Sequence, residues 1–129
     1  MTVCLDSSAY IQLIRGRRAV ADYLGTCGEI VVPAAVVAEL TEGFCRARDA
    51  DRQNIALGRF LDRNNVRFRA ADYLVAVRYG FIAQQLRRKG TPLPINDVWI
   101  AATALEEGAS IVSYDRHFDE FGLIPRIAP

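Results

Sequence analysis

The chain has 129 residues, of which 51% are hydrophobic and 24% charged, a composition typical of a globular domain and not of a disordered tail. Sixteen basic and fifteen acidic residues leave a net charge of +1, which excludes a histone-like basic protein and a strongly acidic one. Three widely spaced cysteines and a single histidine form neither a disulfide framework nor a zinc motif, and no apolar run is long enough to span a membrane. We therefore expect one soluble, cytoplasmic domain over residues 1–129 with reduced cysteines.

The predicted elements alternate along the chain. A strand rich in β-branched residues at 2–5 is followed by helices, and so are similar strands at 29–32 and, more weakly, 66–69. The later strands are 110–113 and 124–127, and Pro125 restricts the last one to the edge of a sheet. The helices between the strands are expected at 8–15, 18–24, 33–44, 49–63, 71–89 and 96–107. Strands that alternate with helices predict an α/β fold with a parallel sheet covered on both faces.

Apolar residues at helical spacing support these assignments. In the segment 71–89, Leu74, Val77 and Phe81 recur every three or four residues, and the basic residues 87–89 precede a glycine stop. The segment that begins at Asn96 repeats the same spacing and stops at Gly108.

Four of the fifteen acids follow predicted strands or begin predicted helices. Asp6 directly follows the first strand, Glu39 lies in the early turns of the helix after the second, and Asp115 lies just beyond the strand that ends at residue 113. Asp97 begins the helix that follows a proline-rich turn. Because the carboxyl ends of parallel strands and the following helix N-termini share one edge of a sheet, we expect these four acids to converge there.

Each acid also has an ordinary structural explanation. Asp6 and Asp97 could cap helices, and Asp115 could nucleate the turn at 114–117. Glu39 is harder to explain this way, because it interrupts an apolar helix face and would need an opening to solvent. The convergence of all four acids favours a site over four separate structural roles.

Four neighbouring carboxylates raise one another's pKa values unless a cation compensates their charge. A hard divalent ion with oxygen ligands, Mg²⁺ or Mn²⁺, satisfies that requirement. Such an ion can also lower the pKa of water and neutralise charge on a phosphoryl oxygen, which is what hydrolysis of a phosphodiester requires.

Four segments together resemble the PIN-domain ribonucleases, and most closely the VapC-type toxins of bacterial toxin–antitoxin pairs. In chain order they are residues 5–9 (Leu-Asp-Ser-Ser-Ala), 38–40 (Ala-Glu-Leu), 96–105 (Asn-Asp-Val-Trp-Ile-Ala-Ala-Thr-Ala-Leu) and 111–118 (Ile-Val-Ser-Tyr-Asp-Arg-His-Phe). The resemblance covers essentially the whole chain, and the segment 96–105 is its most specific part.

The resemblance implies an α/β/α sandwich with a central, mainly parallel sheet and an endoribonuclease that depends on Mg²⁺ or Mn²⁺ and hydrolyses RNA with an activated water. It also implies the catalytic and metal-binding residues, which are Asp6, Glu39, Asp97 and Asp115, with Ser7 orienting the first of them. Many family members carry another acid two positions after the last one, where this chain has His117. That difference leaves the number of metal ions open, and we expect His117 to lie at the surface or pack beside Phe118.

The resemblance further implies three kinds of partner: RNA, a cognate VapB-type antitoxin, and a second copy of the chain in a homodimer and in a toxin–antitoxin hetero-oligomer. The candidate RNA contacts near the acidic edge are Arg15, Arg17, Arg116 and His117. The alternatives are a PIN-like nuclease that cleaves DNA, one that processes RNA outside a toxin–antitoxin pair, and a binding protein without catalysis. A receiver domain and a nucleotide-binding module fit less well, because the chain has no lysine after a late strand and no glycine-rich phosphate loop.

Overall fold

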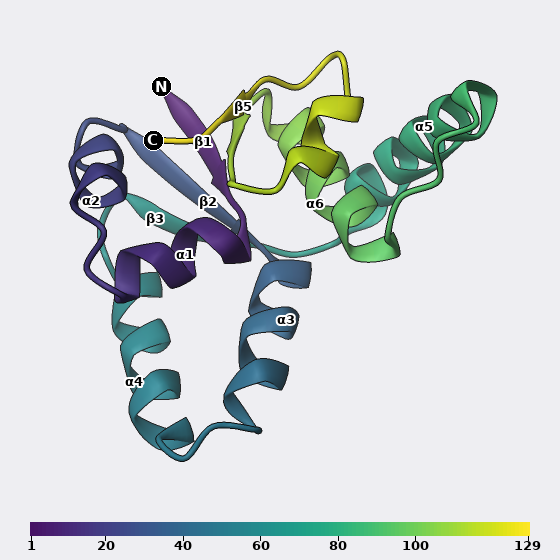
Figure 1. Ribbon diagram of the computed structural model, residues 1–129. Helices are drawn as coiled ribbons and strands as arrows, with labels where there is room; N and C mark the ends of the chain where they lie inside the picture. The colour runs from purple at the N-terminus through teal and green to yellow at the C-terminus, as the bar shows by residue number, and fades with distance from the viewer.

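The computed structural model describes residues 1–129 and contains one five-stranded parallel sheet in the order β3-β2-β1-β4-β5 (Figure 1). Its strands are β1 (Thr2–Leu5), β2 (Glu29–Pro33), β3 (Val66–Arg69), β4 (Ser110–Val112) and β5 (Arg126–Ile127). In the centre of the sheet, Cys4 is paired with Val31 on one side and Ile111 on the other. The short strand after Pro125 lies at the edge, as the sequence predicts, because proline cannot donate to a strand ladder.

The helices cover both faces of this sheet. They are α1 (Ser7–Ile14), α2 (Arg18–Gly25), α3 (Ala34–Phe44), α4 (Ala50–Leu61), α5 (Tyr73–Lys89) and α6 (Ile95–Glu107), followed by the 3-10 helix η1 (Arg116–Glu120). The connections from β1 to β2 and from β2 to β3 advance in one direction, and the connection through α5 and α6 returns past β1 to β4. Right-handed crossovers therefore place α5 and α6 on the opposite face from α1 to α4. The predicted α/β/α sandwich is confirmed.

The core lies on both faces of the central strands. Val3, Leu5, Val31 and Ile111 are fully buried, which explains why these strands read as continuous apolar runs instead of alternating ones. No helix is both long and apolar enough to cross a membrane.

Helix α5 is apolar on two opposite sides. Val75, Ile82 and Leu86 face the core and are buried, whereas the residues that reveal the helical spacing in the sequence, Leu74, Val77 and Phe81, are each between 43% and 52% exposed. At about 100° per residue, these two sets lie on opposite sides of the helix axis. Figure 1 shows α5 projecting away from the sheet beside α6, which explains why its outer side has no cover.

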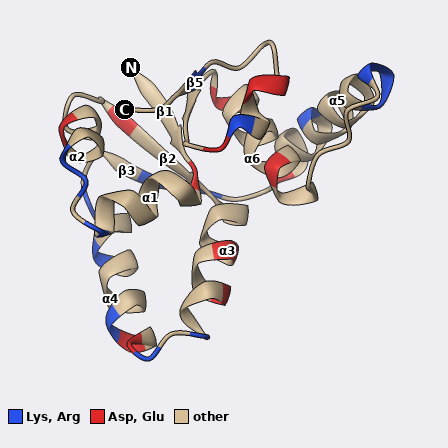
Figure 2. Cartoon of the chain, viewed as in Figure 1, with Lys and Arg blue, Asp and Glu red and all other residues tan.

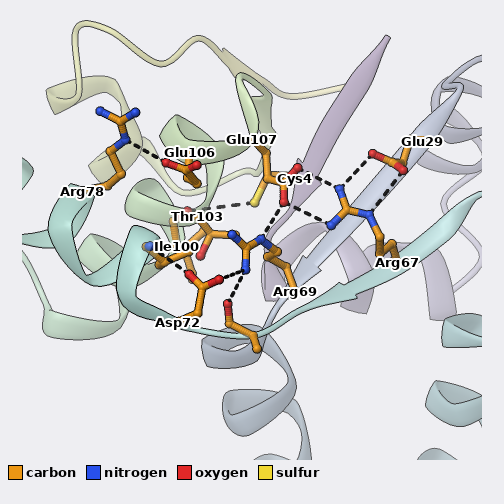
Figure 3. A network of polar contacts seen from close by, with 12 residues as sticks. Cys4, Glu29, Arg67, Arg69, Asp72, Arg78, Ile100, Thr103, Glu106 and Glu107 are labelled. Carbon is orange, nitrogen blue, oxygen red and sulfur yellow. Dashed lines mark hydrogen bonds and ion pairs between the residues drawn. The ribbon is translucent and has the colours of Figure 1, made fainter.

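A network of ion pairs ties α5 and α6 to the sheet (Figure 3). Arg67 of β3 contacts Glu29 of β2 at 3.1 Å and Glu107 at the end of α6 at 2.7 Å. Arg69 contacts the same Glu107 at 2.7 Å and Asp72, the N-cap of α5, at 2.9 Å. We call these five residues the arginine network. It fixes the start of α5 and the end of α6 against β2 and β3.

Candidate metal centre

The four predicted acids come together at the carboxyl edge of the sheet. Figure 2 shows acidic positions at the end of β1, on α3, at the start of α6 and in the segment between β4 and η1. Glu39 interacts electrostatically with Asp6, Asp97 and Asp115, although these residues are far apart in the sequence. The topology brings them together, because β1, β2 and β4 are neighbours and all end at this edge.

Asp6 is buried and held by serine hydroxyls. Its Oδ2 accepts hydrogen bonds from Ser113 Oγ at 2.6 Å and from Ser8 Oγ at 2.8 Å. Ser7, the residue expected to orient Asp6, lies farther away, with its Oγ 3.5 Å from Oδ1. The sequence does not predict that Ser8 and Ser113 hold Asp6. Only the parallel pairing of β1 with β4 places Ser113 beside Asp6.

Asp97 and Asp115 lie on either side of His117. The imidazole Nδ1 of His117 lies 3.0 Å from Asp97 Oδ2 and 3.4 Å from Asp115 Oδ1. One potential ligand atom from each of these three side chains lies within 4.8 Å of the other two. The expectation that His117 is a surface or packing residue is therefore incomplete, because its ring is half exposed but directed at two site carboxylates.

The capping explanations apply to one of the acids. Asp6 precedes α1 but makes no side-chain capping bond, and Asp97 lies inside the first turn of α6 after the N-cap Pro94. Asp115 does accept a hydrogen bond from the backbone N–H of His117, at 2.9 Å. Capping therefore accounts for the position of Asp115 and leaves Asp6 and Asp97 without that role.

Glu39 has an unsatisfied carboxylate oxygen. Its Oε1 is buried and has no hydrogen-bond partner. Burial, followed by the negative charges of Asp6, Asp97 and Asp115, raises the pKa of Glu39 from 4.5 to about 7. Burial also raises the pKa of Asp97, although the hydrogen bond from His117 opposes the increase.

These residues fit a divalent cation. No lysine or arginine forms an ion pair with Asp6, Glu39, Asp97 or Asp115 (the pairs made by arginine and lysine are with Asp22, Glu29, Glu42, Asp72, Glu106, Glu107, Asp119 and Glu120). A buried carboxylate oxygen without a partner costs free energy, and a cation removes that cost. Carboxylate oxygens are the donors that Mg²⁺ and Mn²⁺ prefer, so the donor set matches the ion expected from the sequence.

Two hollows meet at Glu39. A small one of about 450 Å³ is lined by Glu39, Asp97, Asp115, His117 and three residues of the turn into α6. A larger one of about 920 Å³, which we call the α1–α3–α4 groove, begins at Ser7 and Glu39 and continues to α4. The apolar lining of this groove includes Tyr10, Ile11 and Ile14 of α1.

The candidate RNA-contact arginines are exposed around this region. Arg15 lines the α1–α3–α4 groove, and Arg116 is the first residue of η1. Arg17 stacks over the ring of Tyr114, with its guanidinium carbon 4.4 Å from the ring centroid. Arg116 directly follows Asp115, Arg17 reaches the neighbouring Tyr114, and Arg15 shares the groove with Glu39.

Comparisons with known proteins agree with this geometry. Residues 3–123 match the family described as the PIN domain. The ribonuclease VapC1 of Haemophilus influenzae strain R2866 is 25% identical over 119 residues, which cover 89% of this chain and 87% of that protein. The structure of VapBC2 from Rickettsia felis, bound to a promoter DNA fragment, superposes with a TM-score of 0.87 at 21% identity over 98% of both chains. VapBC-1 from nontypeable Haemophilus influenzae gives a TM-score of 0.84 at 23% identity, over 98% of this chain and 97% of that one.

Proposed function

Because the chain belongs to the PIN domain family, we propose that residues 1–129 form a single VapC-type nuclease domain, a toxin that hydrolyses RNA with the help of a divalent metal ion. The observation that carries the proposal is the convergence of four acids without a lysine or arginine partner, one of which has a buried, unpaired oxygen. The similarity to a protein named as a ribonuclease supports RNA as the substrate.

In this proposal Asp6, Glu39, Asp97 and Asp115 hold Mg²⁺ or Mn²⁺. When bound, the ion lowers the pKa of water and neutralises charge on the phosphate. Ser8 and Ser113 keep the Asp6 carboxylate in one orientation, and burial keeps Asp97 in a fixed position at the start of α6. Such preorganisation saves the cost of arranging the carboxylates in each catalytic cycle.

The chemical step is an in-line attack of water on phosphorus. The bond from phosphorus to the 3′-oxygen breaks, which leaves a 5′-phosphate and a 3′-hydroxyl without participation of the 2′-hydroxyl. The exposed guanidinium groups of Arg15, Arg17 and Arg116 contact phosphates or stack on unpaired bases around the acids. His117 is the remaining candidate for contact with the RNA.

The test is cleavage of single-stranded RNA and DNA of the same base sequence, with Mn²⁺ or Mg²⁺ and then with EDTA. We expect cleavage of RNA only, its loss in EDTA, and its loss in Asp6→Asn purified by the same protocol. The asparagine can still accept hydrogen bonds from Ser8 and Ser113, so this variant keeps the fold. Cleavage of DNA alone would replace the RNA assignment, and equal activity of Asp6→Asn would overturn the site.

We also propose that the α1–α3–α4 groove receives a segment of a VapB-type antitoxin. The groove has an apolar lining from α1 and reaches Glu39, so a segment seated there lies beside the site. The named complexes of the similar structures are VapBC pairs, which supports this type of partner. A VapB protein co-expressed from the neighbouring reading frame should co-purify and inhibit RNA cleavage, and Ile14→Asp, at an exposed position of the lining, should weaken the complex.

We propose that two copies of the chain form a homodimer through the outer side of α5. Tyr73, Leu74, Val77 and Phe81 expose a continuous apolar strip there, which is typical of a protein interface. Light scattering should give twice the mass of one chain, and Val77→Arg should reduce it to one. A wild-type mass equal to one chain contradicts the dimer.

A further inference from the structure

His117 has the position of a metal ligand. Its Nδ1 faces Asp97 Oδ2 at 3.0 Å and Asp115 Oδ1 at 3.4 Å, and the ring lines the small hollow. The backbone of the same residue is fixed independently, because its N–H donates to Asp115 Oδ1 at 2.9 Å. The main chain thus places His117 beside Asp115, and the ring's own contacts with Asp97 and Asp115 direct the imidazole into the site.

Packing does not account for this orientation. The side chain of His117 is 51% exposed, and its neighbour Phe118 packs instead against Phe121, with ring centroids 5.9 Å apart. Glu39 lines the same hollow, and its Oε1 is buried without a hydrogen-bond partner, which independently favours a cation there. Nitrogen and oxygen donors therefore face one space that needs a positive charge.

The nitrogen changes which ion such a site prefers. Mg²⁺ favours oxygen donors and is reluctant to lose its water, whereas imidazole suits Fe²⁺, Ni²⁺, Cu²⁺ and Zn²⁺, and Mn²⁺, which also accepts oxygen ligands, is the first ion of the same transition series. Carboxylates alone discriminate weakly between Mg²⁺ and Mn²⁺, because both ions accept oxygen ligands. A single imidazole among carboxylates shifts the balance toward the transition ion.

We infer that an imidazole nitrogen of His117 is a ligand of the divalent ion and that it makes the site select a transition ion such as Mn²⁺ over Mg²⁺. This inference rests on the metal site of the proposed function. It makes His117 a selectivity-determining ligand at the position where many PIN-domain proteins carry an acid.

The first test measures binding without nucleic acid. The EDTA-treated protein is titrated calorimetrically with Mn²⁺ and with Mg²⁺ at alkaline pH, because the hydrogen bond to Asp97 and the charge of Asp115 raise the pKa of His117 above its ordinary value. We expect His117→Ala to lower the affinity for Mn²⁺ by about tenfold or more, since losing even an outer-shell partner of a metal ligand costs roughly 10- to 100-fold. His117→Asp, which supplies oxygen in place of nitrogen, should keep Mg²⁺ binding and lower the ratio of Mn²⁺ to Mg²⁺ affinity.

Asp62→Asn is the matched control. Asp62 is an exposed acid at the C-cap of α4, just before β3 and therefore at the opposite edge of the sheet. Its loss should leave both affinities unchanged. An unchanged affinity ratio in His117→Ala and His117→Asp, or no divalent ion binding to the wild-type protein, would overturn the inference.

The second test observes the ligand atom directly. His117 is the only histidine, so its two imidazole nitrogens give the only histidine signals in a nitrogen-15 NMR spectrum. Saturation with Zn²⁺, a diamagnetic probe, should shift one nitrogen and abolish its titration with pH, because a ligand nitrogen cannot be protonated. Nitrogens that continue to titrate in the presence of Zn²⁺ would show that His117 only contacts the acids or the phosphate, and would overturn the inference.

These measurements separate this inference from the proposed function. Metal binding through His117 without RNA cleavage would leave the inference standing and overturn the nuclease. RNA cleavage with Mg²⁺ and Mn²⁺ alike, together with an affinity ratio that substitution of His117 does not change, would support the nuclease and overturn the inference about His117.

Discussion

Two groups of acids in this protein experience opposite environments. In the arginine network, hydrogen bonds from Arg67 and Arg69 lower the pKa of Glu107, and a hydrogen bond from Arg69 lowers that of Asp72. At the carboxyl edge of the sheet, burial raises the pKa values of Glu39 and Asp97, and neighbouring acids add to the increase. Ionised carboxylates therefore stabilise the fold in the arginine network, whereas ionising Glu39 and Asp97 at the carboxyl edge costs free energy.

The difference depends on which cations the fold places beside the acids. Each carboxylate of the arginine network has an arginine within 3.1 Å, so its charge is compensated within the chain. The acids of the candidate metal centre have only His117, a weaker base than arginine. Acids whose pKa values are raised by burial and by neighbouring acids make this cluster a candidate functional site.

The largest expected effect comes from removing one acid of the candidate metal centre. Asp97→Asn should reduce metal-dependent RNA cleavage by roughly 100-fold or more, because losing even an outer-shell partner of a metal ligand costs up to about 100-fold. It should not lower the melting temperature in EDTA, because the variant removes a charge that burial disfavours. Cleavage rates and thermal unfolding of Asp97→Asn beside the surface variant Asp62→Asn measure both expectations. Full activity, or a large loss of stability, would contradict the contrast between the two acid groups.

Removing an acid of the arginine network should have the reverse effect. Glu107 is only 15% exposed in its side chain and contacts two arginines, so Glu107→Gln should lower the free energy of unfolding by about 2 kcal/mol, as for the loss of charged hydrogen bonds. Cleavage per folded molecule should not change. Denaturant unfolding at neutral pH measures the loss, and Glu106→Gln, one residue earlier in α6 and paired with half-exposed Arg78, is the milder comparison.

The pH dependence of the same variant sharpens this prediction. The folded pKa of Glu107 is depressed, so its stabilising contribution is present above the ordinary value of 4.5 and is lost as the pH falls through the lower folded value. Wild type and Glu107→Gln should therefore converge in stability under strongly acidic conditions. A difference in stability between wild type and Glu107→Gln that stays constant down to the pH of acid unfolding would contradict the ion pairs of Glu107 with Arg67 and Arg69.

Glu39 should show the opposite pH dependence. Its pKa rises from 4.5 to about 7 on folding, so the cost of ionising it is absent below 4.5, grows as the pH increases, and is complete above about 7. In EDTA, Glu39→Gln should therefore be more stable than wild type at pH values above 7, by about 1 kcal/mol after allowance for solvent screening, and equal to it at acidic pH. Melting curves across this pH range provide the measurement. Destabilisation at alkaline pH would mean that Glu39 already has a compensating partner.

The smallest expected effect comes from an acid that has a partner but is fully hydrated. Asp22 lies 3.9 Å from Arg18 on α2, and the two side chains are 73% and 92% exposed. Asp22→Asn should change the free energy of unfolding by less than about 0.5 kcal/mol, because water screens exposed pairs. An effect as large as that of Glu107→Gln would show that burial is not what separates the arginine network from ordinary surface pairs.

Much of the fold follows from local sequence patterns. The five strands and six helices lie within a few residues of their predicted bounds, because β-branched runs, helical spacing and glycine stops act over short distances. The convergence of the four acids also follows from the order of elements, since parallel strands end at one edge.

Other parts of the site depend on contacts that the sequence does not encode locally. Ser113 binds Asp6 although the two residues are 107 positions apart in the sequence. Of the two serines that follow Asp6, Ser8 makes the shorter hydrogen bond to its carboxylate, at 2.8 Å against 3.5 Å for Ser7. A single histidine carries no spacing signal, so the sequence predicts for His117 a surface, packing or RNA-contact position, and only the fold directs its ring at Asp97. Helical spacing alone also does not tell exposed apolar residues from buried ones, so the sequence does not show that Leu74 and Val77 lie on the outer side of α5.

Glu39 belongs to the lining of both the small hollow and the α1–α3–α4 groove. A ligand in the groove and an ion in the hollow would therefore share one carboxylate, and their binding free energies are not independent. Any factor by which the first changes the affinity of the second applies equally in the other direction. With an ion in the hollow, the metal content of a preparation would affect how tightly a groove ligand binds, and affinities for that ligand should be compared at a stated concentration of free divalent ion.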